Sequence, residues 1–278
     1  MGPNALPFRD SGTVVLNSRF AMATNAIIRD DAGTLVIKSA SNHVQGVTVQ
    51  QGLLKLGVDE PFAVAPWLSI GKGANNPGNK ATVDLDGYRL TVSRLVDAHW
   101  VAFNGTSSEG YQRILCSTPS TLVVDGTSAG TYTNAGSIMS GPLTLIKAGT
   151  GSLSLGQTNA LSGAVIVSNG VLAVTLTGGL GTGATNIVVA GGTLSLSNSA
   201  ALCPEANVTF AEEGSGLVFL PQDVNVRVST LWYGEHQKYA GTYGASDSGA
   251  QYVDDSRFSG TGLLTVLHGK NGTIISVQ

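Results

Sequence analysis

Apolar residues alternate with polar ones in short runs along the whole chain. Thr13–Leu16, Thr34–Ile37, Leu53–Leu56 and Leu90–Val92 are examples, and Gly, Asn, Ser or Asp residues separate such runs. A period of two predicts β-strands with one buried face. Strong helix formers are scarce while Gly, Ser, Thr and Val are plentiful, so we expect almost no helix. Strands that recur this regularly leave a sandwich, a barrel and a solenoid as candidate folds.

An internal repeat favours the solenoid. A segment that begins at Gly33 returns at Gly151, and the turn-rich stretch 73–79 is an insertion found in the first copy only. Insertions in turns, with strands kept in register, are how repeat architectures vary. Four landmarks recur 117 or 118 residues later, in the pairs Gly33 and Gly151, Asn42 and Asn159, Gly46 and Gly163, and Gly52 and Gly170.

The spacing of the strands predicts stacked coils. Each coil would take about 20 to 30 residues, which gives roughly ten coils at about 4.8 Å per layer. Inward residues would form apolar ladders, for example Leu35 with Ile37, Val165 with Val167 and Leu172 with Val174. We therefore predict an all-β parallel β-helix, or β-solenoid, with β-sandwich modules as the alternative.

Residues 141–175 carry a motif that resembles the autotransporter-associated β-strand repeat of secreted bacterial surface proteins. The first copy departs from the motif, with Ser39 and Ser41 near its glycine positions and Gln45 in place of its serine. The resemblance implies a parallel β-helix outside the cell or on the bacterial cell surface, generally a presenting stalk or surface layer rather than an enzyme. The matching residues are Lys147, Gly149, Gly151, Leu153, Leu155, Asn159, Ser162, Gly163, Gly170, Leu172 and Val174.

Residues 231–266 resemble the closing module of secreted bacterial proteins that carry this repeat. We therefore divide the chain into a repeat-containing β-solenoid, residues 1–205, and a continuous C-terminal capping module, residues 206–278. Leu263–His268 and Thr273–Val277 flank Asn271-Gly272, and Asn-Gly is the strongest short hairpin signal. This pair predicts a β-hairpin cap.

Charge and the length of the apolar runs argue against two classes of partner, nucleic acid and the membrane. The chain has 15 Lys and Arg against 18 Asp and Glu, a formal net charge of −3. It offers no basic field for nucleic acid. No apolar run approaches the ~18 residues of a membrane-spanning helix, so we expect no membrane insertion.

Candidate catalytic or metal-binding residues do not form a known motif. His43, His99, His236 and His268 lack zinc-site spacing. Asp84-Leu85-Asp86-Gly87 resembles the start of a calcium loop but lacks its other ligands, and a strand entering an Asp-Gly turn explains it better. We expect no metal, no cofactor and no enzymatic activity.

Two acid pairs are the candidates for a polysaccharide-cleaving dyad, namely Glu212 with Glu213 and Asp254 with Asp255. Adjacent strand residues point to opposite faces, so neither pair is a ready-made dyad. Clustered acids and bases beside a Trp or Tyr in a groove would favour such an enzyme.

Aromatic residues gather near the C-terminus and are candidates for contacts with a partner or for sealing the core. Aromatic faces suit sugar and protein surfaces, yet they equally suit the end of a β-helix, and we favour the cap. These residues are Trp232, Tyr233, Tyr239, Tyr243 and Tyr252.

Two further expectations concern the coils. Cys116 and Cys203 would lie three to four coils apart, about 15 Å or more, so they should be unpaired. The first coil around Thr13–Leu16 has no helix to cover its edge, which predicts contact with another chain or with further coils of a longer protein, and end-to-end stacking into homo-oligomers.

These observations together predict a non-catalytic, extracellular structural or surface-presenting β-helix, such as a fibre-forming module or an adhesin stalk. The alternative is a β-helix that binds or cleaves a polysaccharide. An extracellular glycan or protein would be the partner in either case.

Overall fold

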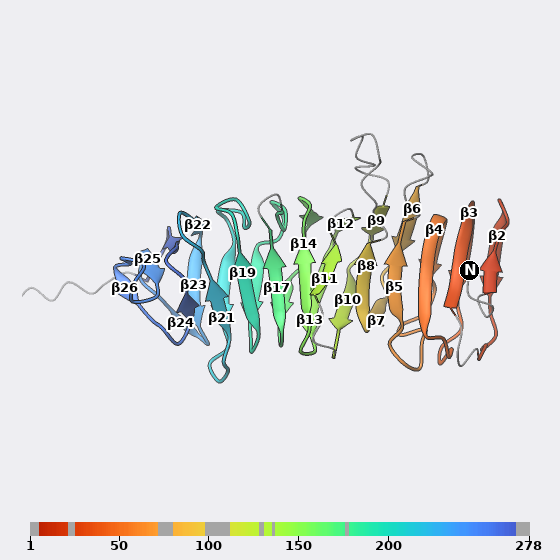
Figure 1. Cartoon of the computed structure of the whole chain (residues 1–278), viewed down its shortest axis with the longest axis horizontal. Coiled ribbons are helices and arrows are strands. Elements are labelled where there is room, and N and C mark those ends of the chain that lie inside the picture. Colours follow the sequence, from red (N-terminus) through yellow and green to blue (C-terminus); the bar gives the residue numbers. More distant parts are fainter. Residues whose placement is uncertain are drawn as a thin grey trace, which may run out of the picture.

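The computed structural model describes residues 6–21, 26–71, 80–97, 112–127, 131–134, 137–175 and 178–270, and all of their regular structure is β-strand. The strands stack along the long axis of one elongated body (Figure 1). Between Ser120 and Tyr233, parallel partners in the stack lie 19 to 24 residues apart along the chain. The fold is a parallel β-solenoid, which confirms the predicted class. In the described segments, no helix could span a membrane.

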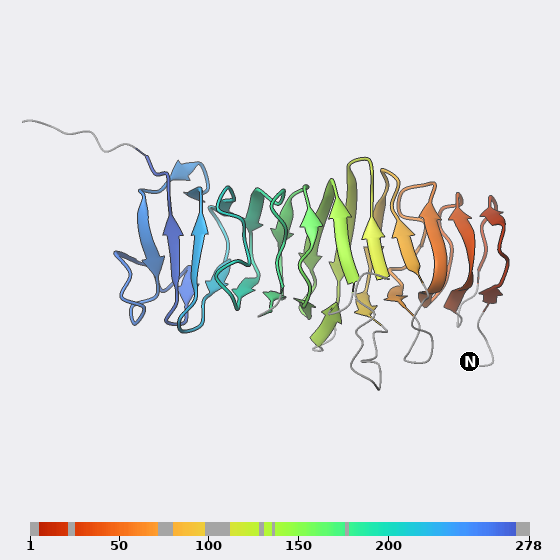
Figure 2. The same cartoon turned by 90° about the horizontal axis from the view of Figure 1, so that it is seen from above.

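Each coil has three sides, and each side is a column of strands, seen from a second direction in Figure 2. The first side contains β1 (Leu6–Phe8), the start of β3 (Ala26–Ile37) and of β4 (Gly46–Leu56), β5 (Trp67–Ile70), β8 (Arg94–Asp97), β11 (Thr131–Asn134), β14 (Ser152–Leu155), β17 (Val171–Val174), β19 (Thr193–Leu196), β21 (Leu217–Phe219) and β27 (Phe258–Ser259). The second side contains β2 (Thr13–Leu16), the ends of β3 and β4, β6 (Ala81–Asp84), β9 (Gln112–Leu115), β12 (Ser137–Gly141) and β15 (Ala160–Leu161). The third side contains β7 (Arg89–Val92), β10 (Ser120–Asp125), β13 (Leu143–Ala148), β16 (Val165–Val167), β18 (Asn186–Val189), β20 (Asn207–Phe210) and β23 (Thr230–Tyr233).

The C-terminal end departs from parallel stacking. β24 (His236–Gln237) folds back antiparallel on β23, and β25 (Gly241–Gly244) runs antiparallel to β28 (Leu263–Val266). A separate sheet joins β22 (Asn225–Val228), β28, β25 and β26 (Tyr252–Val253) in that order. The solenoid has about eight turns, slightly fewer than the ten expected.

The predicted hairpin partner of Leu263–His268 needs correction. The strand β28 has β22 on one edge and β25 on the other, and a strand has only two edges for pairing. Its antiparallel partner is therefore Gly241–Gly244, which is earlier in the chain. Thr273–Val277 and Asn271-Gly272 lie outside the described residues, as does the insertion at 73–79.

The core is one continuous cluster of inward side chains. It runs from Ile27 to Val266, across the expected boundary at residue 205, whose position stays a prediction. Alternation produces this core, since every second side chain of a strand points inward. The predicted ladder residues are all fully buried: Leu35, Ile37, Val165, Val167, Leu172 and Val174.

Two buried cations occupy the same position in the two repeat copies. Arg29 lies four residues before Gly33 and Lys147 four residues before Gly151, and both side chains are almost completely buried. Arg29 donates to the carbonyl oxygens of Gly33 (3.0 Å) and Phe8 (2.7 Å). Lys147 likewise donates to the carbonyl of Gly149 (3.1 Å) and to carbonyls of Ala148 and Asn169. These charges satisfy backbone carbonyls where the chain turns from one side to the next.

The repeat landmarks Asn42 and Asn159 also make equivalent contacts. Each buried carboxamide accepts a hydrogen bond from the preceding layer, from the backbone N–H of Phe20 (3.1 Å) or Met139 (2.9 Å). Each also donates to a carbonyl of the following layer, that of Pro61 (2.7 Å) or Gly179 (3.0 Å). One Asn side chain thereby ties three successive coils together.

Candidate functional site

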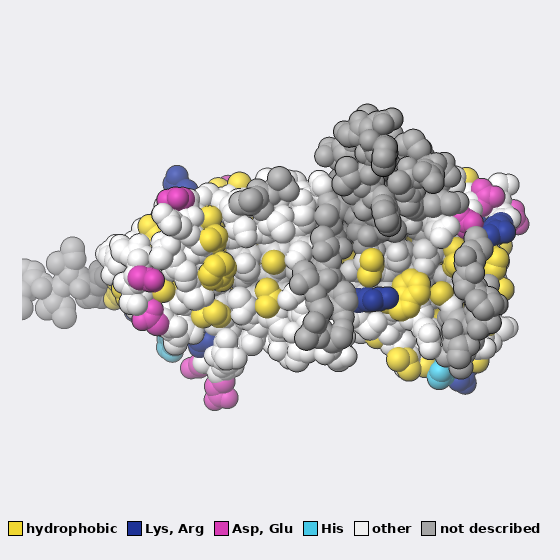
Figure 3. Space-filling view, viewed as in Figure 1, with side chains coloured by type: hydrophobic (Ala, Val, Ile, Leu, Met, Phe, Trp, Pro, Cys, Tyr) yellow, Lys and Arg dark blue, Asp and Glu magenta, His cyan; other side chains and the backbone are white. Residues whose placement is uncertain are grey.

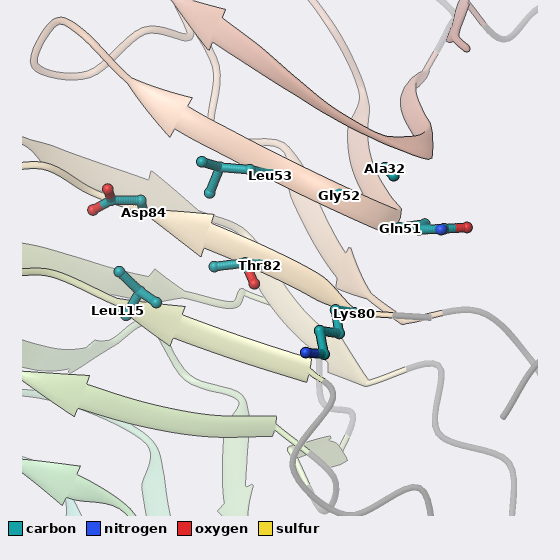
Figure 4. Close-up of a pocket in the computed structure, with 8 residues that line it drawn as sticks. All are labelled: Ala32, Gln51, Gly52, Leu53, Lys80, Thr82, Asp84 and Leu115. Carbon is teal, nitrogen blue, oxygen red and sulfur yellow. The ribbon is translucent and has the colours of Figure 1, made fainter. Parts of the chain in front are cut away.

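A shallow groove of about 450 Å³ lies along the second side, near the corner with the first. Leu53, Thr82 and Leu115 come from the three neighbouring strands β4, β6 and β9 (Figure 4). Lys80 and Asp84 lie at opposite ends of β6. The groove is lined by Ala32, Gln51, Gly52, Leu53, Lys80, Thr82, Asp84 and Leu115.

Lys55 beside this groove pairs with two carboxylates. Its Nζ lies 3.0 Å from Asp86 and 3.8 Å from Asp84. The hydrogen bond to Asp86 is the largest cause that raises the pKa of Lys55, and the charge of Asp84 and the nearby Tyr88 add to it. A lysine that acts as a general base needs a lowered pKa, so Lys55 is poorly suited to remove a proton at neutral pH.

The Asp84–Gly87 segment is the Asp-Gly turn that the sequence favoured. Asp84 accepts the backbone N–H of Asp86 (2.9 Å), and Asp86 and Gly87 have positive φ angles of 49° and 94°. Three charged residues therefore gather near Tyr88, which meets part of the criterion for a polysaccharide-cleaving site. Only Asp84 of the three lines the groove, and Lys55 compensates both acids.

Neither predicted acid pair forms a dyad. Glu212 and Glu213 are both exposed in a turn. Asp254 accepts the hydroxyl of Tyr233 (2.9 Å), whereas Asp255 accepts the backbone N–H of Ser246 (2.7 Å). Among the described residues, no group of three His, Cys, Asp or Glu side chains could hold a metal ion. His99 lies outside those residues.

The C-terminal aromatic residues gather at the end of the core, although unevenly. Tyr243 is buried and stacks on Tyr252 with ring centroids 4.8 Å apart. Tyr233 packs edge-on against Phe210 at 5.4 Å. Tyr239 is 42% exposed. Trp232 is partly exposed and donates from Nε1 to the Thr230 hydroxyl (2.9 Å).

Sequence reasoning missed the cations that hold this cluster. Arg257 lies 5.3 Å from the ring centroid of Phe210 and 5.7 Å from that of Tyr233, and it donates to the Gly214 carbonyl (2.8 Å). Lys238 lies 3.9 Å from the Tyr233 centroid. Cation–π contacts depend on spatial proximity across coils, which sequence spacing alone does not reveal.

Burial shifts the pKa values of ionisable groups in this cluster. Burial and the hydrogen bond to Asp254 raise the pKa of Tyr233 far above its usual value, and burial raises the pKa of Tyr243 to about 12. Burial by itself raises the pKa of Asp254. Hydrogen bonds from Ser256 and Tyr233 and the charge of Arg257 outweigh that effect, so the pKa of Asp254 is lowered.

Cys116 and Cys203 are both unpaired and buried, as their spacing predicted. Burial is the main cause that raises the pKa of both thiols. Neither therefore has the lowered pKa of a reactive cysteine.

The fold and these surfaces define a parallel β-solenoid protein with long outward faces. The chain is similar to the adhesin BmaC autotransporter of Brucella suis biovar 1 (strain 1330), with 25% identity over 291 residues. The match covers 98% of this chain but 8% of that protein, so the chain spans a small part of its relative's length. No protein-family model matches the chain. No solved structure matches it.

Together, the fold and this similarity support an autotransporter-like β-helix. The particular repeat family that the motif at 141–175 resembles is not confirmed, since no family model matches.

Proposed function

We propose that this chain is a non-catalytic structural section of a cell-surface β-solenoid, displayed outside the cell in the manner of an adhesin passenger. The continuous core from Ile27 to Val266 carries the proposal, because it makes the chain an extended support with side chains projecting from three faces. The similarity to an adhesin autotransporter supports the location. The motif at 141–175 supports descent from the autotransporter-associated repeat.

The location is tested by labelling intact cells that produce the protein with a membrane-impermeant, amine-reactive biotin. Lys38 and Lys80 are exposed and should react without lysis. Labelling that appears only after the cells are broken would place the protein inside and contradict the proposal. A cytosolic protein of the same cells serves as the control for leakage.

The non-catalytic role is tested by incubating the purified chain with acidic and neutral polysaccharides and measuring their chain length. We expect no shortening, because Lys55 neutralises the acids beside the groove. Depolymerisation that disappears in Asp84→Asn would instead establish the polysaccharide-cleaving alternative.

We propose further that the N-terminal layer pairs with a strand of another chain or with further coils of a longer protein, and that copies of the purified chain associate through this edge. The strands β1 and β2 each pair with β3, and no described residue pairs with their other edge. Leu6 and Val15 in this layer are each 40% exposed. An unpaired strand edge offers backbone N–H and C=O groups with which a further strand can pair.

Light scattering over a concentration series tests the association. The proposal predicts a monomer–dimer equilibrium that Val15→Lys shifts toward monomer, since a charge on an edge strand opposes pairing. A strict monomer at high concentration would contradict it.

A further inference from the structure

Trp67 lies flat on the outer surface of the first side, where sequence reasoning had not singled it out. It stands between Gly46 of β4 and Arg94 of β8 in the strand register. A Cβ atom at Gly46 would lie 1.9 Å from Cε2 and 2.2 Å from Cζ2 of the indole. The glycine therefore leaves the space in which the ring rests on the sheet, and Trp67 remains partly exposed.

Arg94 places a positive charge beside this ring. Its guanidinium carbon lies 5.7 Å from the ring centroid, and its side chain is exposed. Figure 3 shows hydrophobic side chains gathered over β4 and β5 beside a Lys or Arg side chain. Within the part of the chain that the structure describes, no carboxylate forms an ion pair with Arg94. Thr48 and Ser69 lie side by side on the neighbouring outward row, both partly exposed.

The chemistry of this surface selects one kind of ligand. A flat aromatic ring on a rigid sheet stacks against the apolar face of a sugar ring, and a guanidinium binds a carboxylate in a planar, bidentate manner. Hydroxyl groups such as those of Thr48 and Ser69 suit the sugar hydroxyls. A peptide would gain affinity by pairing with a strand edge, but β5 is paired on both sides, with β4 and β8.

We propose that Trp67 and Arg94 form a binding platform for an acidic sugar residue of a glycan. The sugar ring stacks on the indole, and its carboxylate pairs with Arg94. Uronic acids and sialic acids share this chemistry. The inference does not depend on the proposed cellular location, because it concerns the purified chain.

Calorimetric titration tests the platform with a glucuronate-containing tetrasaccharide and with sialyllactose, each against a neutral sugar of similar size. Binding of either acidic probe in preference to its neutral counterpart is the expected result, and the two probes distinguish the sources of the carboxylate. Arg94→Gln should weaken binding about tenfold or more, the usual loss for a charge-assisted pair. Trp67→Ala should abolish measurable binding.

Two matched controls separate the platform from general surface effects. Phe219→Ala removes another aromatic residue exposed on the first side, and Arg227→Gln removes an exposed arginine from β22. Both should bind as the parent chain does. The proposal is overturned if neither acidic probe binds, if neutral sugars bind equally well, or if Arg94→Gln, which retains the fold, binds unchanged.

Discussion

At the scale of single residues, buried polar side chains at the corners determine how the coils join. Asn42 and Asn159 bridge neighbouring layers, and Arg29 and Lys147 donate hydrogen bonds to the backbone carbonyls of the turns. A buried backbone group without a hydrogen-bond partner destabilises the fold. Each of these side chains supplies such a partner, which an apolar residue of the same size could not do.

Replacing Asn159 by alanine should destabilise the chain by about 3 kcal/mol. The change removes three hydrogen bonds and leaves the buried N–H of Met139 without its acceptor. Thermal unfolding followed by circular dichroism measures the effect. Asn186→Ala, at an exposed position, should change the midpoint little. Equal effects of the two substitutions would contradict the role given to Asn159.

The packing of Trp67 on Gly46 predicts a coupling between the two residues. Gly46→Ala should destabilise the parent chain by about 1 to 3 kcal/mol, because the new methyl group collides with the indole. The same change in a Trp67→Ala background should cost much less. A double-mutant cycle measures this difference, and additive effects would show that the ring does not rest on Gly46.

At the scale of elements, the strands could be predicted from alternation, but their placement around the coil could not. The strand that follows Gly33 lies on the second side, whereas its repeat counterpart β14, after Gly151, lies on the first. A separation of 118 residues is not a whole number of coils, so the motif moves by one side between copies. The motif therefore specifies the structure of a corner, and it can occur at any of the three corners of a coil.

The candidate platform was hidden from the sequence for the same reason. Gly46, Trp67 and Arg94 are separated by 21 and 27 residues, and only the strand register brings them into one row. The C-terminal aromatic residues were visible as a local cluster, but Phe210 and Arg257, which pack against them, come from other elements. Sequence patterns therefore predict which residues are close along one strand better than which residues are close in neighbouring layers.

The C-terminal end should show a defined dependence on pH. The folded-state pKa of Asp254 is lowered, so its ionised form contributes stability above about pH 4, and that contribution is lost as the pH falls. The parent chain should therefore be more stable than Asp254→Asn at pH 7, and the difference should shrink toward pH 3. Denaturation curves at both pH values measure it, and a difference that grows on acidification would contradict the assignment.

At the scale of the whole molecule, one core connects all of the coils, including the C-terminal end. In a stack, each coil contacts mainly its neighbours, so stability is close to a sum of coils and interfaces. The two buried cysteines report on different parts of this stack, since Cys116 follows β9 and Cys203 precedes β20.

Thiol labelling in increasing urea, followed by mass spectrometry, should show whether the coils around Cys116 and Cys203 unfold together. In the absence of denaturant both thiols should react slowly, because burial shields them and raises the pKa of each. A continuous core predicts that both become reactive in the same narrow range of urea concentration. Widely separated transitions would show that the stack is divided into independent units.

The central claim is that this chain forms one continuous parallel stack, and a distance between spin labels tests it most directly. Thr91 and Thr209 occupy the same outward row of the third side, joined through Val123, Ile146, Ile166 and Val188. Five layer steps correspond to about 24 Å. Labels at Thr91→Cys and Thr209→Cys, in a chain with Cys116 and Cys203 replaced by alanine, should give a single narrow distribution near this distance. A maximum below about 15 Å, as strands folded into a β-sandwich could produce, would contradict the solenoid.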